Sequence, residues 1–173
     1  MGMTASQRKE VRDTLHLLKP RGVEHVAEDF SNLDDIVAEY DKLYKIGREL
    51  IVVEDRTLAE GLASQPNERQ FFGLCTSLLK GIVKALEVRL AAARGKLYSE
   101  VLKTEPRDIS DRAINQIIDG NDDIFDLNME LIKVREYYER FNDLVESYNQ
   151  RGFALNNLTK AMDAAIQEMI VNE

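Results

Sequence analysis

The chain has 173 residues, a formal net charge of −8, and fractions of 44% hydrophobic and 31% charged residues. This balance excludes an intrinsically disordered protein and is typical of a folded helical one. No apolar run approaches the roughly 20 residues that span a bilayer, and the start does not resemble a signal peptide, so we expect a cytoplasmic protein with no membrane partner. The single cysteine, Cys75, excludes an internal disulfide framework.

Residues 1–66 are expected to form a smaller, helical N-terminal region. Gln7 to Leu18 could form a short helix that stops at Lys19-Pro20-Arg21-Gly22, because proline and glycine together break regular structure. The pattern over Val23 to Phe30 leaves a short strand and a helical turn open. Residues 1–30 have no long period, and partial flexibility is left open for them.

A second helix is predicted to start near Ser31-Asn32-Leu33, and its apolar residues recur at helical spacing as far as Leu62. Ile51-Val52-Val53 is β-branched and could be strand, but it lies inside the helical pattern and is assigned to the helix. The composition of Ala63-Ser64-Gln65-Pro66 predicts a turn that ends this segment.

Residues 67–173 are predicted to form a long antiparallel helical hairpin with a C-terminal oligomerisation helix. The first long helix starts at Asn67 and stops before Pro106, because a residue that precedes proline is displaced from helical geometry. Ser110 then caps a short corner helix that ends at Asp119-Gly120. The fold class is therefore all-α.

The second long helix carries an apolar repeat with 3-4-3-4 spacing from Ile124 to Met169, interrupted only by Gly152 and Thr159. This spacing places one continuous apolar seam on the helix and favours coiled-coil-like packing. Gly152 is expected to break or bend the helix, because glycine costs about 1 kcal/mol relative to alanine in a helix interior.

We expect a homo-oligomer that assembles through the helix after Gly152. Apolar residues continue there beyond the stretch that a hairpin with residues 67–103 would cover. A long exposed apolar stripe usually marks a partner surface. The residues expected in this interface are Gly152, Phe153, Leu155, Leu158, Met162, Ile166 and Met169.

Two groups of residues resemble metal sites, and neither is predicted to bind a metal. His16 and His25 flank a turn and have no cysteine near them in the sequence. Four ligand positions of a calcium loop would be Asp119, Asn121, Asp123 and Glu130. The sixth position of such a loop needs glycine, and here it is Ile124. Known phosphate-loop and nucleophile motifs are missing from the sequence, so no catalytic residue and no cofactor is predicted.

Residues 67–107 form a basic segment, with 8 Lys+Arg against 4 Asp+Glu, in an otherwise acidic chain. Cations spaced along a helix can neutralise successive phosphates, and a tyrosine can stack on a base. The candidate contacts to single-stranded DNA are Lys80, Lys84, Arg89, Arg94, Lys96, Tyr98 and Lys103. The alternative is that these side chains lie beside the core and pair with an acidic partner helix.

The segment Ser147-Tyr148-Asn149-Gln150-Arg151-Gly152-Phe153-Ala154-Leu155 resembles the UvsY-type recombination mediator proteins of tailed phages, in which a comparable Arg-Gly-Phe-Ala sequence interrupts a long C-terminal helix. The similarity extends back to about Ile117. A weaker similarity covers residues 90–99, where that family has a basic, tyrosine-containing stretch tied to single-stranded DNA binding. Arg94 and Tyr98 match that stretch. Lys96 does not match a basic family position, and Ala92 stands where the family tends to be basic.

The resemblance implies a ring-shaped homo-oligomer that binds single-stranded DNA. It would help a RecA-like recombinase displace single-strand-binding protein and load, without catalysis of its own, in the host cytoplasm if the chain is phage-encoded. We therefore predict a recombination mediator. Two alternatives remain: a phage structural or scaffolding protein that uses the same seam for assembly, and an enzyme whose carboxylates were not recognised.

Overall fold

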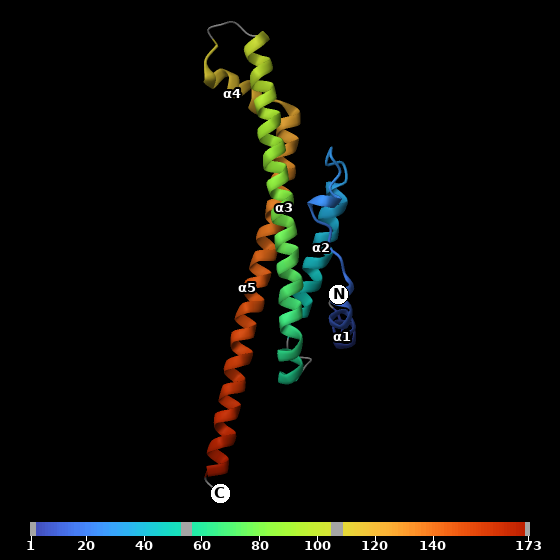
Figure 1. Cartoon of the computed structure of the whole chain (residues 1–173), viewed down its shortest axis with the longest axis vertical. Coiled ribbons are helices and arrows are strands. Elements are labelled where there is room, and N and C mark those ends of the chain that lie inside the picture. Colours follow the sequence, from blue (N-terminus) through green and yellow to red (C-terminus); the bar gives the residue numbers. More distant parts are fainter. Residues whose placement is uncertain (1–2, 53–56, 105–108, 172–173) are drawn as a thin grey trace. The chain divides into compact units, whose positions relative to one another are not determined.

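The computed structural model describes residues 3–52, 57–104 and 109–171, the last three by their backbone alone, and every regular element in these ranges is helical (Figure 1). The predicted all-α class is confirmed. Within these ranges, no helix combines the length and apolarity needed to cross a bilayer. The elements are α1 (Ala5–Thr14), α2 (Leu33–Leu50), α3 (Leu58–Thr104), α4 (Asp111–Asp119) and α5 (Asp122–Val171), with 3-10 turns at Leu15–Leu17 and Val23–His25.

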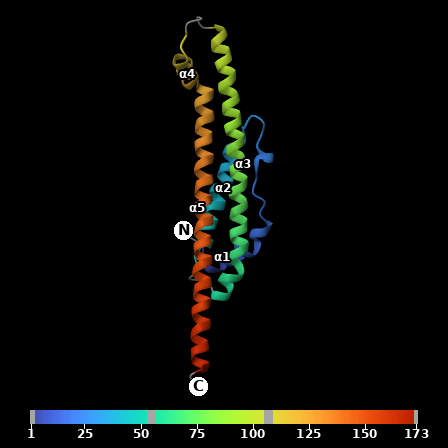
Figure 2. The ribbon, with the colours of Figure 1, turned by 60° about the vertical axis from the view of Figure 1, so that its left-hand side comes forward.

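The chain divides into two compact units, and each contains parts of α2, α3 and α5. The first unit comprises residues 1–20, 38–77 and 139–173, and the second unit comprises residues 21–37 and 78–138. In each unit α3 lies beside α5, and α4 forms the corner of the predicted hairpin (Figures 1 and 2). The units do not follow the expected boundary at residue 66, because α3 runs through that position.

An aromatic core joins α2, α3 and α5 in the first unit. Tyr40, Phe72, Phe141 and Tyr148 are completely buried. The rings of Phe72 and Tyr148 are nearly parallel, with centroids 5.4 Å apart, and the rings of Tyr40 and Phe141 meet edge to face at 5.6 Å. The Tyr148 hydroxyl donates to the Gly47 carbonyl at 3.1 Å. Burying one such side chain stabilises a fold by roughly 1.5–3 kcal/mol, so these rings hold the three helices together.

An aliphatic cluster closes the hairpin in the second unit. It contains Val101 of α3, Ile114 and Ile118 of α4, and Ile124 of α5, all of which are buried. The Ser110 hydroxyl accepts a hydrogen bond from the Ala113 N–H at 3.3 Å, so the predicted cap of the corner helix is confirmed. The two isoleucines four residues apart place the apolar face of α4 on this cluster.

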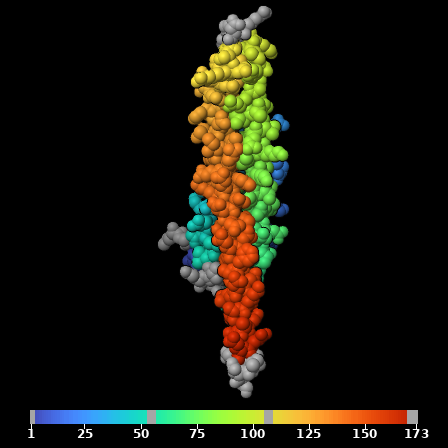
Figure 3. Space-filling model, turned by 90° about the vertical axis from the view of Figure 1, so that its left-hand side faces the viewer, coloured from blue at the N-terminus to red at the C-terminus, as the bar shows by residue number. Residues whose placement is uncertain are grey.

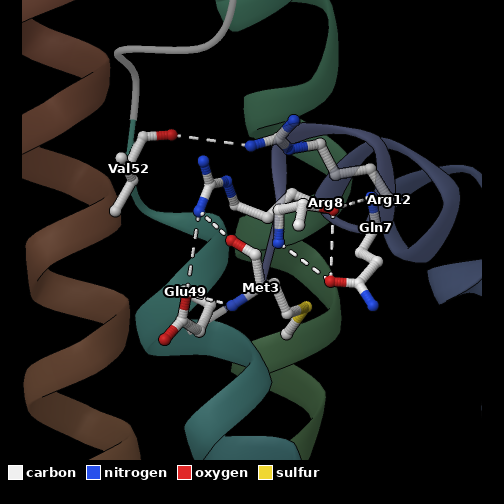
Figure 4. A network of polar contacts seen from close by, with 7 residues as sticks. Met3, Gln7, Arg8, Arg12, Glu49 and Val52 are labelled. Atoms are coloured by element: carbon white, nitrogen blue, oxygen red, sulfur yellow. Dashed lines mark hydrogen bonds and ion pairs between the residues drawn. The ribbon is translucent and has the colours of Figure 1, made fainter. Parts of the chain in front are cut away.

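Polar contacts attach α1 to the first unit, and none of its residues is buried. The Arg8 guanidinium lies 3.7 Å from the Glu49 carboxylate, which also accepts from the Met3 N–H at 3.1 Å (Figure 4). Arg12 donates to the Val52 carbonyl at 3.5 Å. The partly exposed Arg8–Glu49 pair contributes only about 0–1 kcal/mol, so Arg12, whose side chain is 10% exposed, makes the more important polar contacts of α1.

The boundary between α2 and α3 differs from the prediction. α2 ends at Leu50, so Ile51 and Val52 lie outside it, and Val53 falls outside the described residues. Arg151 donates to the Leu50 carbonyl at 3.2 Å, and Arg12 donates to the Val52 carbonyl. These arginines satisfy backbone acceptors at the end of the helix, where the sequence pattern alone predicted more helical turns.

The turn predicted at residues 63–66 is also wrong, because α3 starts at Leu58 and contains Pro66. Proline in a helix interior costs about 3 kcal/mol. Tertiary contacts of adjacent residues offset this cost: the Gln65 amide donates to the Tyr148 carbonyl at 2.9 Å, and Glu68 binds Arg151.

The apolar seam of α5 packs into the core as far as Leu155. The helix continues through Gly152 without the predicted break. A Cβ atom at Gly152 would lie 2.6 Å from Nε2 of Gln65. Glycine therefore leaves room for the Gln65 side chain of α3 and does not change the direction of α5. Of the two possibilities for Val23–Phe30, the structure has a 3-10 turn at Val23–His25.

Candidate nucleic-acid interface

The seven predicted DNA contacts lie on the part of α3 that belongs to the second unit. The four lysines among them are exposed, and Arg89, Arg94 and Tyr98 are half-buried. All seven side chains project from α3, but the contacts that each side chain makes with nearby residues determine whether it is available to a ligand.

Arg94 and Tyr98, which match the mediator family's stretch, both bind α4. Nη2 of Arg94 lies 2.8 Å from Oδ1 of Asp119, and the Tyr98 hydroxyl donates to Oδ1 of Asp111 at 3.0 Å. The hydrogen bond to Asp111 and the charge of that carboxylate raise the pKa of Tyr98. These contacts fasten both ends of the corner helix to α3.

Arg89 and Lys96 also have partners inside the second unit. Nη1 of Arg89 donates to the Glu28 carbonyl at 2.6 Å, and its guanidinium lies 4.8 Å from the centroid of the Phe30 ring. Lys96 forms an exposed ion pair with Glu100 at 3.9 Å, one helical turn away. Such exposed pairs contribute only about 0.3–0.5 kcal/mol, so Lys96 could exchange Glu100 for a phosphate at little cost.

Lys80, Lys84 and Lys103 are exposed, and none of them forms an ion pair with another residue that the structure describes. Lys80 and Lys84 are one helical turn apart and therefore project from the same side of α3. Among the four lysines predicted to contact DNA, these three are the ones without an ion pair to a described residue, whereas Lys96 pairs with Glu100.

Acidic residues gather beside Arg89 around a hollow of about 390 Å³, which Asp29, Asp123, Asp126 and Glu130 help to line. Burial raises the pKa of Glu130, and the charges of Asp34 and Asp126 raise it further. In the described residues, no group of three His, Cys, Asp or Glu side chains is arranged to hold a metal ion.

Asn121, one of the residues of the calcium-like sequence, has a structural role at the start of α5. Its side-chain oxygen accepts a hydrogen bond from the Ile124 N–H at 3.2 Å. Asn121 therefore caps the long helix.

The predicted assembly surface separates into two parts. Leu155 is buried beside Gly61, and Gly152 contacts Gln65, so both belong to the core of the first unit. From residue 156 to residue 168 no side chain is buried, and Figure 3 shows these last turns of α5 with no other helix packed over them on that face. The exposed apolar side chains there and at residue 153 are Phe153 (71%), Leu158 (52%), Met162 (50%) and Ile166 (53%). The side chain of Met169 falls outside the described residues.

A polar cluster of Arg12, Glu68 and Arg151 in the first unit was not predicted from the sequence. Glu68 is 1% exposed and Arg151 is 8% exposed. Glu68 stands three residues before Phe71 and seven before Cys75, and Arg151 stands three residues after Tyr148, so each charge interrupts an apolar helix face. A charged residue within an apolar helix face was therefore the sequence feature from which the burial of Glu68 and Arg151 could have been predicted.

No protein family, curated protein or solved structure with which the chain was compared gives a match, so the resemblance to recombination mediators stays a prediction.

Proposed function

We propose that this protein is a non-enzymatic recombination mediator. It binds single-stranded DNA and helps a RecA-like recombinase load onto strands covered by single-strand-binding protein. The observation that carries the proposal is that Lys80 and Lys84 are exposed on one side of α3, without an ion pair to any described residue. Exposed cations of this kind can replace the counterions of a phosphate backbone.

Self-assembly is the second part of the proposal. The basic segment of one chain carries a net charge of +4 in a molecule of net charge −8, so a single subunit should bind DNA weakly. Association of copies through Leu158, Met162 and Ile166 would repeat the lysines on one particle. Linked weak contacts then increase the affinity by orders of magnitude, provided that one strand can reach several copies.

Fluorescence anisotropy with a labelled single strand, measured over a range of salt concentrations, tests the DNA part. The affinity should fall with salt by a slope of about 0.7 per neutralised phosphate. Replacing both lysines (Lys80→Ala with Lys84→Ala) should lower the affinity and reduce the slope by about 1.4. The control variant, Arg94→Ala, is compared with Lys84→Ala alone, because it removes the same single charge from a cation that already pairs with Asp119. It should have the smaller effect, and a parent protein that binds no single strand at low salt would end the proposal.

A loading assay tests the mediator part. The DNA-dependent ATPase activity of a RecA-like recombinase should rise when the protein is added to strands covered by single-strand-binding protein. It should change little on bare strands. The lysine double variant should lose most of this stimulation, and equal stimulation on bare strands would contradict a mediator role.

A scaffolding protein without DNA binding is the second candidate. It is favoured by the intramolecular partners of Arg89, Arg94 and Tyr98, which use three of the seven predicted contacts to hold the second unit together. A defined oligomer with no salt-dependent affinity for single strands would establish this alternative.

A further inference from the structure

Phe30 has a backbone conformation that is rare for a bulky side chain. Its φ angle is +63°, the only positive φ at a non-glycine residue among those described. Two hydrogen bonds of Asn32 brace the loop: its amide donates to the His25 carbonyl at 2.8 Å, and its side-chain oxygen accepts from the Ala27 N–H at 2.9 Å. Such strain costs of order 1–3 kcal/mol and persists only where surrounding contacts impose it.

The loop positions the Phe30 ring against Arg89 of α3, with 4.8 Å between the guanidinium carbon and the ring centroid. Nη1 of Arg89 also donates to the Glu28 carbonyl at 2.6 Å, which favours this position of the guanidinium. A guanidinium over an aromatic ring forms a flat, amphipathic surface. Both groups can stack on another planar ring.

Phe30 and Arg89 line an open hollow of about 770 Å³ in the second unit. Its α3 side includes the small or apolar residues Gly81, Ala85 and Val88, and Val88 is 63% exposed. The charged groups that line the hollow are Glu28, Asp29, Lys84 and Arg89. Two carboxylates and two cations leave no net charge, so the hollow suits an uncharged planar group better than a phosphate.

We propose that this hollow binds a nucleobase of a single strand, while Lys80 and Lys84 contact the adjacent phosphates. This inference rests on the proposed DNA-binding function and names the part of the strand that the hollow receives. Lys84 lines the hollow and Lys80 lies one turn away on α3, so backbone and base contacts are adjacent. Phe30 then provides the aromatic stacking that the sequence pattern assigned to Tyr98.

The test compares a labelled 20-nucleotide strand with an abasic strand of the same length, which keeps the phosphates and lacks the bases. The parent protein should bind the base-bearing strand at least about fivefold more tightly, since base–aromatic stacking contributes about that factor or more per base. Phe30→Asn should reduce this ratio towards one. Asparagine accepts a positive φ, so the loop backbone should be retained. Tyr98→Ala is the matched control and should leave the ratio unchanged.

A second variant keeps the test independent of the loop. Val88→Glu places a carboxylate in the hollow from an exposed position of α3 and should also bring the ratio towards one. Equal affinity of the parent for the two strands would overturn the inference while leaving the proposed function intact, and the hollow would then suit a protein segment better. If neither Phe30→Asn nor Val88→Glu changes the ratio of the two affinities, the inference is overturned as well. A parent that binds neither strand would remove both the proposed function and this site.

Discussion

Nη2 of Arg151 lies 2.6 Å from Oε2 of Glu68, and both side chains are buried where α3 and α5 meet in the first unit. Arg12 of α1 approaches the other carboxylate oxygen, with Nε 3.4 Å from Oε1. Arg151 also donates to the Leu50 carbonyl, and its guanidinium lies 4.6 Å from the centroid of the Tyr148 ring. The arginine of the Arg-Gly-Phe sequence is therefore a core residue that joins α5 to α2 and α3, and Glu68 links this cluster to α1 through Arg12.

Removing the charge of Glu68 should strongly destabilise the first unit. Glu68→Gln leaves Arg151 buried without its anionic partner, a change that typically costs about 3–5 kcal/mol. Replacing both residues, as Glu68→Leu with Arg151→Met, should recover part of that loss, because Arg151 no longer leaves a charge buried, whereas Arg12 still loses the Glu68 carboxylate. The free energy of unfolding in urea measures both effects.

An exposed ion pair provides the control for this comparison. Arg135 lies 2.7 Å from Glu87, and both side chains are about half exposed. Arg135→Ala should cost only about 0–1 kcal/mol. If Glu68→Gln costs no more stability than Arg135→Ala, the buried Glu68–Arg151 pair does not stabilise the first unit.

A side chain at Gly152 should displace the Gln65 amide from its hydrogen bond, although Gly152 lies inside a regular helix. A Cβ atom there would lie 2.6 Å from Nε2 of Gln65, which donates to the Tyr148 carbonyl. Gly152→Leu should therefore destabilise the protein by about 1–3 kcal/mol, the usual range for overpacking. Gly95 has open space at its Cβ position, so Gly95→Ala should stabilise the helix by up to about 1 kcal/mol. Thermal unfolding of both variants checks the contrast, and a Gly152→Leu protein as stable as the parent would contradict it.

Helical periodicity predicted much of the core, because apolar residues with 3-4 spacing must face another apolar surface. The seam residues Ile124, Val134, Phe141 and Tyr148 are all buried. Periodicity failed at Pro66, because the contacts of Gln65 and Glu68 with α5 that compensate for a proline come from residues some 80 positions away.

The candidate site was predicted as a set of cations, and the sequence could not show which of them were already paired. Arg94 and Tyr98 bind carboxylates at the two ends of α4, and only the fold brings these carboxylates to α3. Phe30 was missed for a related reason. Its importance comes from a backbone conformation and a contact with Arg89, 59 positions later in the sequence, and neither leaves a periodic pattern.

The exposed end of α5 should determine the subunit number. Met162→Glu with Ile166→Glu changes two side chains that are about half exposed and contribute nothing to the buried core. The folded subunit should keep its stability, while charges in an apolar contact should lower the sedimentation coefficient towards that of a monomer. The control, Asn156→Glu with Gln167→Glu, adds the same charge at exposed polar positions of the same segment. An unchanged subunit number in the first variant would exclude this surface as the interface.

Cys75 should be unreactive in the native protein. It is completely buried in the first unit, and burial raises the pKa of its thiol to about 12. Since the thiolate is the reactive form, labelling with an aromatic disulfide at pH 8 should be very slow until denaturant unfolds the chain. Labelling that is complete within seconds in native buffer would contradict the packing of α3 described here.

Glu130 should make the stability of the second unit depend on pH. Burial is the largest cause of its raised pKa, the charges of Asp34 and Asp126 add to it, and the charges of Arg89 and Lys133 oppose it. The folded protein therefore binds this proton more tightly than the unfolded chain does. The resulting stabilisation is fully present below the ordinary pKa near 4.5 and is lost as the pH rises through the raised value.

Replacing this carboxyl by an amide tests the sign of the effect. Glu130→Gln cannot ionise, so it should be more stable than the parent at pH 7.5, and the difference should shrink as the pH falls towards 4.5. Asp163→Asn, on the exposed end of α5, controls for the loss of one negative charge. Urea unfolding at several pH values gives the free energies. A difference between Glu130→Gln and the parent that grows on acidification would mean that contacts to the ionised carboxylate outweigh its burial.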